Sequence, residues 1–238
     1  MRAYLVSDTL RQFINEVFST QQRHHFGPDP DDFRTTPGGA IDMNALREAG
    51  FVNAGVGASR QTFFIPDIDD KVLKIAYGNN SRRFNKYEAN NQLQTAFPEF
   101  IPRVYAAADD YEWIISERVN VISSDAQFNT VLLKMFPAIT DAIRGQFKHR
   151  ITPRAILIAM LRRPGISEYS DEVFKQVMHE NPDAAKSVAR QMTRLIAMVH
   201  QFNIDPAEIR VDNVGTRYGQ QDSFVLLDAS IFSDKLGI

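Results

Sequence analysis

The sequence predicts an α+β fold, with a strand-rich N-terminal half and a largely helical C-terminal half. Three observations support this prediction. Residues 62–65 and 72–76 are β-branched, aromatic and apolar runs typical of strands, and the Pro-Asp-Ile-Asp-Asp segment between them has turn chemistry. Residues 121–203 carry apolar side chains at helical spacing. Residues 203–215 and 224–230 indicate two short strands joined by a turn, so we expect an antiparallel sheet, then a helical block and a hairpin.

The composition limits the kinds of protein and of chemistry that are expected. The 238 residues, 44% of them hydrophobic, suffice for one or two domains with a core. A net charge of −2 gives no electrostatic footprint for nucleic acid, and the absence of cysteine excludes disulfides, thiol catalysis and zinc–thiolate sites. The sequence has no run of about 18 apolar residues and no signal-peptide core, so we expect a cytoplasmic protein without a membrane partner.

The N-terminal segment is expected to be an extension that precedes the sheet. Thr9–Phe18 has helical apolar spacing, whereas residues 20–45 are polar and rich in Pro, Gly and Asp, which favours a loop. Its His and Asp side chains suggest either a metal site or, as the favoured interpretation, a solvated surface: His24, His25, Asp29, Asp31 and Asp32. The predicted division is an extension over 1–45, an N-terminal part over 46–119 and a C-terminal part over 120–238.

Two helices of the C-terminal part have clear signals. Ala155–Leu161 is strongly apolar and is followed by Arg-Arg-Pro-Gly, which is a helix stop. Ala184–Phe202 has apolar residues at helical spacing, and we expect one long helix there that leads into the next loop.

A glycine-containing hairpin is the first candidate for ligand binding. Gly55 and Gly57 leave the backbone free to approach a phosphate closely. They precede a strand and do not open a helix, which argues against a dinucleotide fingerprint or a P-loop. Lys74 interrupts the apolar run of the following strand, so its ammonium needs a partner or a wet cleft. An ordinary hairpin without a ligand is the alternative interpretation.

A polar helix is expected to follow this strand. Asn80 or Ser81 is a suitable helix cap, and Phe84, Tyr87 and Leu93 are expected to share roughly one face. Glu88 lies about two turns into the helix, on or near that face. It is either an ordinary solvated side chain or a partner of the strand lysine, the two pairing over a nucleotide.

Asn213 and Asp228 end the two short strands near the C-terminus. Magnesium takes oxygen ligands, usually one or two carboxyl-type side chains together with substrate phosphates. The pair therefore suggests a metal–phosphate site. A hairpin with turn-type Asn and Asp and no ligand is the alternative.

The order of these features resembles the protein-kinase-like superfamily. A glycine-rich hairpin, a strand Lys, a helix Glu, a hinge, a helical block, an Asn loop and a strand Asp follow one another over about residues 50–120 and 195–232. The chain is similar to small, minimal kinase-like proteins of bacteria and their phages. The resemblance implies a two-lobed fold, an N-lobe sheet with a C helix and a reduced, mostly helical C-lobe, with ATP and Mg²⁺ bound between the lobes.

The resemblance assigns roles to individual residues. Lys74 matches the lysine that holds the α- and β-phosphates, with Glu88 as its ion-pair partner, and Asn213 and Asp228 match the magnesium ligands. The glycine-rich loop would contain Gly55, Gly57, Ser59 and Arg60, the last standing where the third glycine is usual. Tyr111–Val119 looks like the strand that enters the hinge, with Ser116 behind the pocket and the backbone of Glu117 and Val119 bonding adenine.

The chain departs from the family pattern in its catalytic loop. Glu208 stands five residues before Asn213, where the family has the Asp general base, and Arg210 takes the position of its Lys. Asp205 is a second candidate base if the loop register slips by three, and neither follows a His-Arg pair. Ala-Ser follows Asp228 in place of Phe-Gly, and only ten residues come after Asp228, so we expect a truncated C-lobe.

Three functions remain open at this point. The first is ATP- and Mg²⁺-dependent transfer of the γ-phosphate to a hydroxyl on a protein, as in a Ser/Thr-type kinase. The second is a pseudokinase that captures a partner protein, with or without nucleotide. The third is another chemistry on the same fold, such as small-molecule phosphorylation or nucleotidyl transfer. A phage-encoded protein would act in the host cytoplasm.

Overall fold

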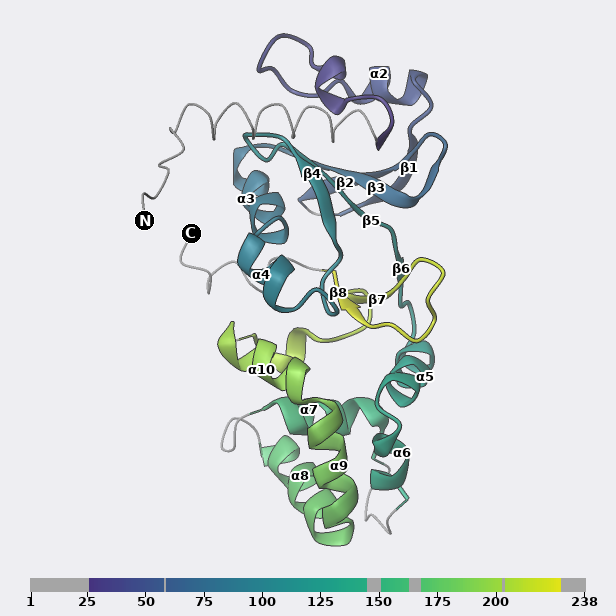
Figure 1. Cartoon of the computed structure of the whole chain (residues 1–238), viewed down its shortest axis with the longest axis vertical. Helices are drawn as coiled ribbons and strands as arrows, with labels where there is room; N and C mark the ends of the chain where they lie inside the picture. Colours follow the sequence, from purple (N-terminus) through teal and green to yellow (C-terminus); the bar gives the residue numbers. More distant parts are fainter. Residues whose placement is uncertain (1–25, 58, 145–150, 163–167, 203, 228–238) are drawn as a thin grey trace, which may run out of the picture. The chain divides into compact units, whose positions relative to one another are not determined.

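The computed structural model describes residues 26–57, 59–144, 151–162, 168–202 and 204–227 (Figure 1). The chain forms two compact units. Unit 1 contains Met1–Lys86 and Val104–Glu117, and unit 2 contains Tyr87–Arg103 and Arg118–Ile238. This division differs from the predicted one in two respects: the extension belongs to the unit that holds the sheet, and residues 87–103 belong to the helical unit. The predicted helix at Thr9–Phe18 and the two histidines lie outside the described residues.

Unit 1 is built on a five-stranded antiparallel sheet with the strand order β1-β2-β3-β5-β4. Its strands are β1 (Val52–Val56), β2 (Arg60–Ile65), β3 (Ile68–Ala76), β4 (Val104–Ala107) and β5 (Trp113–Glu117). The strand predictions at 62–65 and 72–76 are therefore confirmed. The predicted turn between them is shorter than expected. It is formed by Pro66 and Asp67, whose φ of 60° is left-handed, and the chain is extended again from Ile68.

One face of this sheet packs against the extension. Phe63, Leu73 and Ile115 come from three neighbouring strands and are at most 2% exposed, and they form one core with Ile41 and Leu46. The prediction of a loop over 20–45 is therefore wrong for its described part. That segment contains a 3₁₀ helix, η2 (Pro30–Phe33), and the start of α2 (Met43–Glu48). Their N-termini are capped by the side chains of Asp29 and Asp42, so these acidic residues serve the local fold.

Two short helices, α3 (Asn79–Glu88) and α4 (Asn91–Ala96), connect β3 to β4. The predicted helix is confirmed in α3, which ends at Glu88. Asn90 then caps α4 by accepting hydrogen bonds from the backbone N–H groups of Gln92 and Leu93. Because the helix is interrupted there, the predicted common face of Phe84, Tyr87 and Leu93 is divided between two helices.

Within the described ranges, unit 2 combines α4 and six further α-helices with a three-stranded sheet of order β6-β7-β8. The helices are α5 (Asp125–Met135), α6 (Ala138–Ala142), α7 (Pro153–Leu161), α8 (Glu168–Glu180), α9 (Pro182–Gln191) and α10 (Thr193–Gln201), and the strands are β6 (Val119–Val121), β7 (Val214–Arg217) and β8 (Val225–Leu226). One large apolar core joins the helices to the sheet. The predicted end of the apolar helix at Leu161 is confirmed, with Arg162 as the C-cap.

The predicted long helix over Ala184–Phe202 is wrong, because α9 and α10 are separate helices that meet at Met192. Met192 is fully buried and its backbone leaves the helical region, with φ −90° and ψ 2°. The hydroxyl of Thr193 donates to the carbonyl oxygens of Ala189 and Arg190, and such side-chain bonds compete with helix hydrogen bonds. Apolar spacing is the same in a straight helix and a broken one, so the pattern does not reveal the break.

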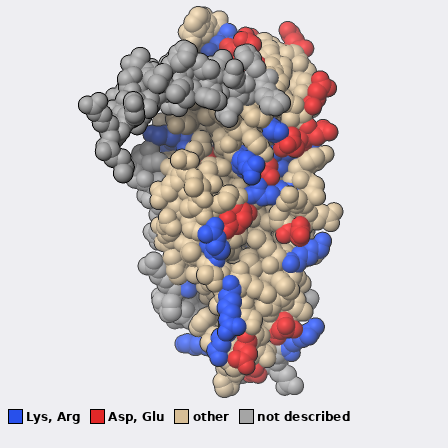
Figure 2. Space-filling view, in the orientation of Figure 1, with Lys and Arg blue, Asp and Glu red and all other residues tan. Residues whose placement is uncertain are grey.

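The surface carries charges of both signs. On the face drawn in Figure 2, Lys and Arg side chains are interspersed with Asp and Glu. In the described part of the chain, no helix has both the length and the apolar character needed to cross a membrane.

Candidate functional site

Lys74 lies on the sheet face that does not pack against the extension. It is half-buried in the central strand β3, opposite Thr62 of β2 and Ile114 of β5. Directly paired residues share a face, and successive residues of a strand alternate between faces. The neighbours Leu73 and Ile75 point into the core, so Lys74 points the other way. This alternation explains how a lysine is accommodated in the middle of an apolar strand.

The two glycines of the β1–β2 hairpin are not required by packing in the chain itself. A Cβ atom added to Gly55 would meet nothing within 4 Å, and one added to Gly57 would only contact the carbonyl oxygen of Arg60 at 3.4 Å. Neither residue has a positive φ. The Gly57 N–H donates to the Arg60 carbonyl at 2.9 Å and closes the turn. The space beside the hairpin is therefore compatible with close approach of a ligand to the backbone.

Arg60 and Ser59 lie at the end of this hairpin. The Ser59 carbonyl accepts the Tyr77 N–H at 3.1 Å, which ties the turn to the end of β3. Arg60 is the first residue of β2, and its Nη1 donates to Asn85 Oδ1 on α3 at 3.2 Å. The arginine predicted to lie on a glycine-rich loop is thus a strand residue that reaches the following helix.

Glu88 is 3% exposed and is the last residue of α3. Its carbonyl accepts a hydrogen bond from Gln94 Nε2 at 2.9 Å. Lys74 belongs to unit 1 and Glu88 to unit 2, so their ion pair stays a prediction.

The predicted hinge coincides with the passage of the chain from unit 1 to unit 2. Glu117 ends β5 opposite Lys71, and Val119 begins β6 opposite Arg217. Ser116 is fully buried on the same sheet face as Lys74, and its hydroxyl has no hydrogen-bond partner among the described residues. Adenine binding by this segment stays a prediction.

The loop that precedes β7 is held by a helix cap, a buried side chain and a backbone hydrogen bond. Asp205 caps a short 3₁₀ helix, η3 (Pro206–Glu208), by accepting the Ala207 N–H at 2.9 Å. Ile209 is fully buried and anchors the loop in the core of unit 2. Asp212 adopts a left-handed φ of 72°, and its N–H donates to the Ile122 carbonyl at 3.0 Å. Asp205 is therefore engaged as a cap, and the loop has a defined conformation.

The side-chain amide of Asn213 is oriented by Glu208. Asn213 Nδ2 donates to the Glu208 carbonyl at 3.1 Å and approaches Glu208 Oε2 at 3.4 Å. A carbonyl oxygen only accepts, so the nitrogen of the amide must face it and the oxygen must face away. Asn213 Oδ1 accepts no hydrogen bond from the described residues. The oxygen that a hard cation would use is thus available.

Glu208 and Arg210 lie on the exposed side of this loop. The Arg210 guanidinium is 3.8 Å from Glu208 Oε2, with side-chain exposures of 58% and 46%. Both groups are accessible to a substrate, and water screens their attraction.

Asp228 lies outside the described residues, so its role as a metal ligand stays a prediction. The residue before it, Leu227, donates its N–H to the Asn213 carbonyl at 2.8 Å. β7 and β8 pair with Val214 opposite Leu226, which places the end of β8 beside the start of β7. No cluster of three or more His, Cys, Asp or Glu side chains suited to a metal occurs within the ranges that the structure describes.

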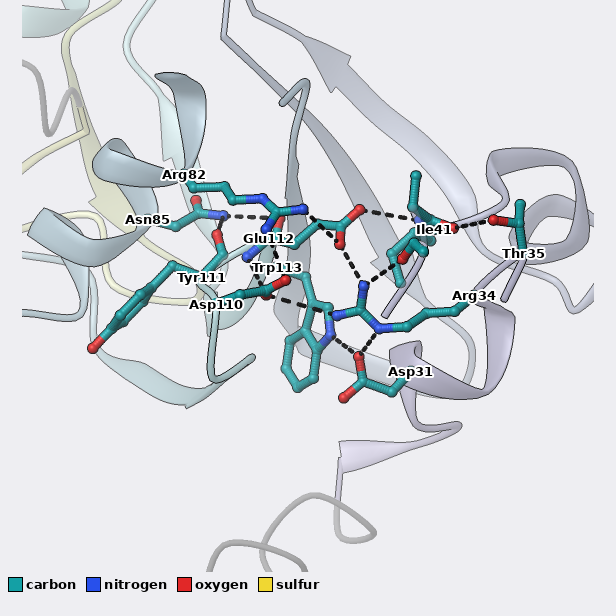
Figure 3. A network of polar contacts seen from close by, with 12 residues as sticks. Asp31, Arg34, Thr35, Ile41, Arg82, Asn85, Asp110, Tyr111, Glu112 and Trp113 are labelled. Atoms are coloured by element: carbon teal, nitrogen blue, oxygen red, sulfur yellow. Dashed lines mark hydrogen bonds and ion pairs between the residues drawn. The ribbon is translucent and has the colours of Figure 1, made fainter. Parts of the chain in front are cut away.

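Sequence reasoning missed a polar network in unit 1 (Figure 3). Glu112 is only 3% exposed and binds the guanidinium groups of Arg34 and Arg82. The partners are separated by 78 and 30 residues, so no local pattern connects them. The only signal in the sequence was the unusual concentration of acidic residues at 29–32 and 109–112.

The comparisons with known proteins show a weak likeness to a solved structure. No family model and no curated protein matches the chain. Among solved structures, the chain is similar to the streptomycin–ATP–APH(2″)-IIa ternary complex, with 12% identity, a TM-score of 0.32 and coverage of 81% of this chain and 74% of that chain. A likeness of this size does not define a shared fold, and the site is therefore interpreted from the chain's own residues.

Proposed function

We propose that this chain has a protein-kinase-like fold, binds ATP with Mg²⁺, and transfers the γ-phosphate to a hydroxyl group on a protein. The orientation of the Asn213 amide is the observation that carries the proposal. Its nitrogen is committed to the Glu208 carbonyl, which leaves Oδ1 as an oxygen ligand. The backbone N–H of Leu227, the residue before Asp228, donates a hydrogen bond to the Asn213 carbonyl. An amide oxygen together with a carboxylate is the kind of ligand set that Mg²⁺ takes alongside phosphate.

Residues of each unit have a proposed role toward the phosphates. Lys74 would supply a positive charge on the sheet face that does not pack against the extension, beside a glycine hairpin that leaves room for close backbone approach. Asn213 and Asp228 would hold the metal ion, which neutralises charge on the β- and γ-phosphates when it is bound. The backbone of Glu117 and Val119 would bond the adenine edge. Positioning and charge neutralisation supply most of the rate in such chemistry.

Glu208 is the proposed base and Arg210 the proposed cation at the γ-phosphate. The acceptor hydroxyl gives its proton to the Glu208 carboxylate as its oxygen forms a bond to the γ-phosphorus. The bond from that phosphorus to the bridging oxygen breaks, and ADP leaves. Glu208 is one methylene longer than the Asp usual in the family, and a misplacement of about 1 Å costs about 100-fold in rate. We therefore expect slow transfer.

Calorimetry of ATP binding and transfer from γ-labelled ATP test the proposal. We expect wild-type protein to bind ATP more tightly with Mg²⁺ than with EDTA and to label a protein in a host lysate. Lys74→Ala and Asn213→Ala should lose labelling, whereas the exposed control Lys186→Ala should keep it. Equal labelling by wild type and the two site variants, or no binding of ATP by wild type, would contradict the proposal.

One further result would point to the alternative function. If wild type binds ATP and Mg²⁺ but labels nothing, the chain is a nucleotide-binding pseudokinase. Capture of a partner protein with and without ATP, by wild type and Lys74→Ala, would then show whether nucleotide controls that capture. Labelling from the α-phosphate instead of the γ-phosphate would indicate nucleotidyl transfer.

A further inference from the structure

Glu112 binds three donors from two different segments of unit 1. Its Oε1 accepts the Ile41 N–H at 3.1 Å, and its Oε2 accepts Arg34 Nη1 at 2.5 Å and Arg82 Nη2 at 3.2 Å. Ile41 and Arg34 belong to the extension, whereas Arg82 belongs to α3. Figure 3 shows the two guanidinium groups reaching the carboxylate from two sides. A single side chain therefore connects the extension to α3.

Because this carboxylate is buried, the loss of one of its partners is expected to be destabilising. Its side chain is 4% exposed and that of Arg34 is 12% exposed. A buried charge is tolerated only when it is paired and hydrogen-bonded, and removing one partner leaves the other uncompensated. Asp31 and Asp110 add further bonds, at 2.7 Å to Arg34 Nε and 2.8 Å to Arg82 Nη1. The network therefore combines charge pairing with hydrogen bonds, which fix the directions in which the two guanidinium groups point.

The same face of α3 also binds the backbone of the β4–β5 turn. Asn85 follows Arg82 by three residues, which places both on one helix face. It is fully buried, and its Nδ2 donates to the carbonyl oxygens of Tyr111 and Glu112 at 2.9 and 3.2 Å. Tyr111 has a left-handed φ of 58°, a conformation that costs about 1–2 kcal/mol for a bulky residue. Asn85 thus stabilises an unfavourable backbone that aims these carbonyls at α3.

Polar contacts matter for α3 because the helix has little apolar surface. Only Phe84 and Tyr87 among its ten residues are aromatic or aliphatic. Apolar packing tolerates small shifts, whereas hydrogen bonds fix distance and angle. The extension contributes to that geometry through Arg34, which also donates to the Gly39 carbonyl at 2.6 Å. Asp31 in turn accepts Trp113 Nε1 at 2.8 Å, so the extension is bound to β5 as well.

We propose that Arg34 and Glu112 are positioning residues that fix α3, so that the extension at 26–45 controls the orientation of this helix. The second part of the inference rests on the proposed function: the orientation of α3 determines the affinity for ATP. The reason is that α3 carries Glu88 and Asn85, and Asn85 binds Arg60 beside the glycine hairpin. Neither Arg34 nor Glu112 contacts the nucleotide in this proposal.

Hydrogen exchange of the full chain, read by mass spectrometry, tests the first part. In Arg34→Ala we expect amides of 79–86 to exchange about tenfold faster or more, since a lost bond to a buried charge shifts a local equilibrium by at least that factor. Amides of 61–65 in β2 should be unaffected. Arg47→Ala is the matched control, because Arg47 lies in α2, directly after the extension, and its guanidinium donates to Asn44 in the same helix. Equal exchange of α3 in both variants, or equal acceleration in β2, would overturn the proposal.

Glu112→Gln decides the question if Arg34→Ala does not fold. It keeps the size of the side chain and removes the charge, so it should also accelerate exchange in α3, and unchanged exchange would refute the proposal. ATP and adenosine affinities test the second part. We expect Arg34→Ala to weaken the affinity for ATP about tenfold and to leave the affinity for adenosine unchanged. An unchanged affinity for ATP would overturn this part. If wild type binds no ATP, the proposed function fails. The hydrogen-exchange measurement still tests whether Arg34 and Glu112 position α3.

Discussion

Among the glycines that the structure describes, Gly215 should tolerate a side chain least. It lies in β7, two residues after Asn213, opposite Val121 of β6. A Cβ atom at this position would lie 2.3 Å from Val119 Cγ1 and 2.8 Å from the Asn120 carbonyl oxygen. Both contacts are shorter than real Cβ atoms allow, and one of them is with backbone. In Gly215→Ala, therefore, β6 and β7 must separate.

The magnitude follows from the way in which each contact can be relieved. Val119 can change rotamer, but the Asn120 carbonyl cannot move without disturbing the strand pair. Overpacking of a buried site costs about 1–3 kcal/mol, and the backbone contact places Gly215→Ala near the middle or above, at about 2 kcal/mol. For a protein of this size, such a loss lowers the melting temperature by about 4–8 °C. Val119→Ala combined with Gly215→Ala removes the side-chain contact and should restore part of this loss.

Thermal unfolding followed by two probes measures the effect. Far-ultraviolet circular dichroism follows mainly the helices, most of which lie in unit 2, while the fluorescence of Trp113, the single tryptophan, reports on unit 1. Gly55→Ala is the control, because its added Cβ meets nothing within 4 Å. We expect the dichroism transition to fall in Gly215→Ala and to stay within about 1 °C of wild type in Gly55→Ala. Equal midpoints in the two variants would refute the steric reasoning.

Three further predictions concern unit 2. Asn213→Asp should lower the stability of unit 2 by about 1–3 kcal/mol, because a carboxylate oxygen would face the Glu208 carbonyl in place of the amide nitrogen. Urea unfolding measures this loss. Asn181→Ala is the control, because the Asn181 side chain makes no capping hydrogen bond. Phe128 stacks on Phe224 with ring centroids 5.9 Å apart and both side chains fully buried, so Phe128→Ala should cost about 3–5 kcal/mol in urea unfolding, whereas the partly exposed Phe174→Ala should cost clearly less. Burial alone would raise the pKa of Glu99, but the hydrogen bond and charge of Arg194 outweigh it and hold that pKa below the ordinary value of 4.5. Its contribution is therefore fully present above pH 4.5 and lost as the pH falls through the lowered pKa. Glu99→Gln should be less stable than wild type near neutral pH, and the difference in stability should shrink as the pH falls through that pKa; a difference that does not change with pH would contradict this.

Features with local signals could be predicted from the sequence. β2 and β3 are recognisable because apolar residues dominate both strands, and Lys74 stands out as the polar interruption. The end of α7 at Leu161 follows from the Arg-Arg-Pro-Gly stop. The first of the two short strands near the C-terminus was expected to end at Asn213, but β7 begins one residue later, at Val214. The spacing of five residues between Glu208 and Asn213 placed both in one loop, where the structure bonds them to each other.

Features that depend on distant partners could not be predicted. Residues 26–45 have the composition of a solvated loop, yet Ile41 packs in the core beside the sheet and Arg34 binds the buried Glu112. Glu112 looks like a surface residue in sequence, because its arginine partners are 78 and 30 positions away. The break at Met192 depends on the side chain of Thr193 and leaves the apolar spacing unchanged. In the first two cases a tertiary contact overrides the local pattern, and in the third a local side-chain bond accompanies a break that apolar spacing does not show.

Asn85 and Asn213 show the same use of one side chain in the two units. Each directs Nδ2 at main-chain carbonyl oxygens that belong to irregular backbone, Tyr111 and Glu112 in one case and Glu208 in the other. In Asn85 the opposite oxygen accepts a guanidinium nitrogen of Arg60, a cation. In Asn213 the opposite oxygen is the proposed ligand of Mg²⁺, also a cation. An amide suits both sites because it donates on one side and accepts on the other, whereas a carboxylate would repel the carbonyls and a hydrophobic residue would leave them without donors. The exchange of Asn for Asp is therefore expected to be harmful at Asn213 although Asp is the more usual metal ligand, since the loop must be held before a metal can be bound.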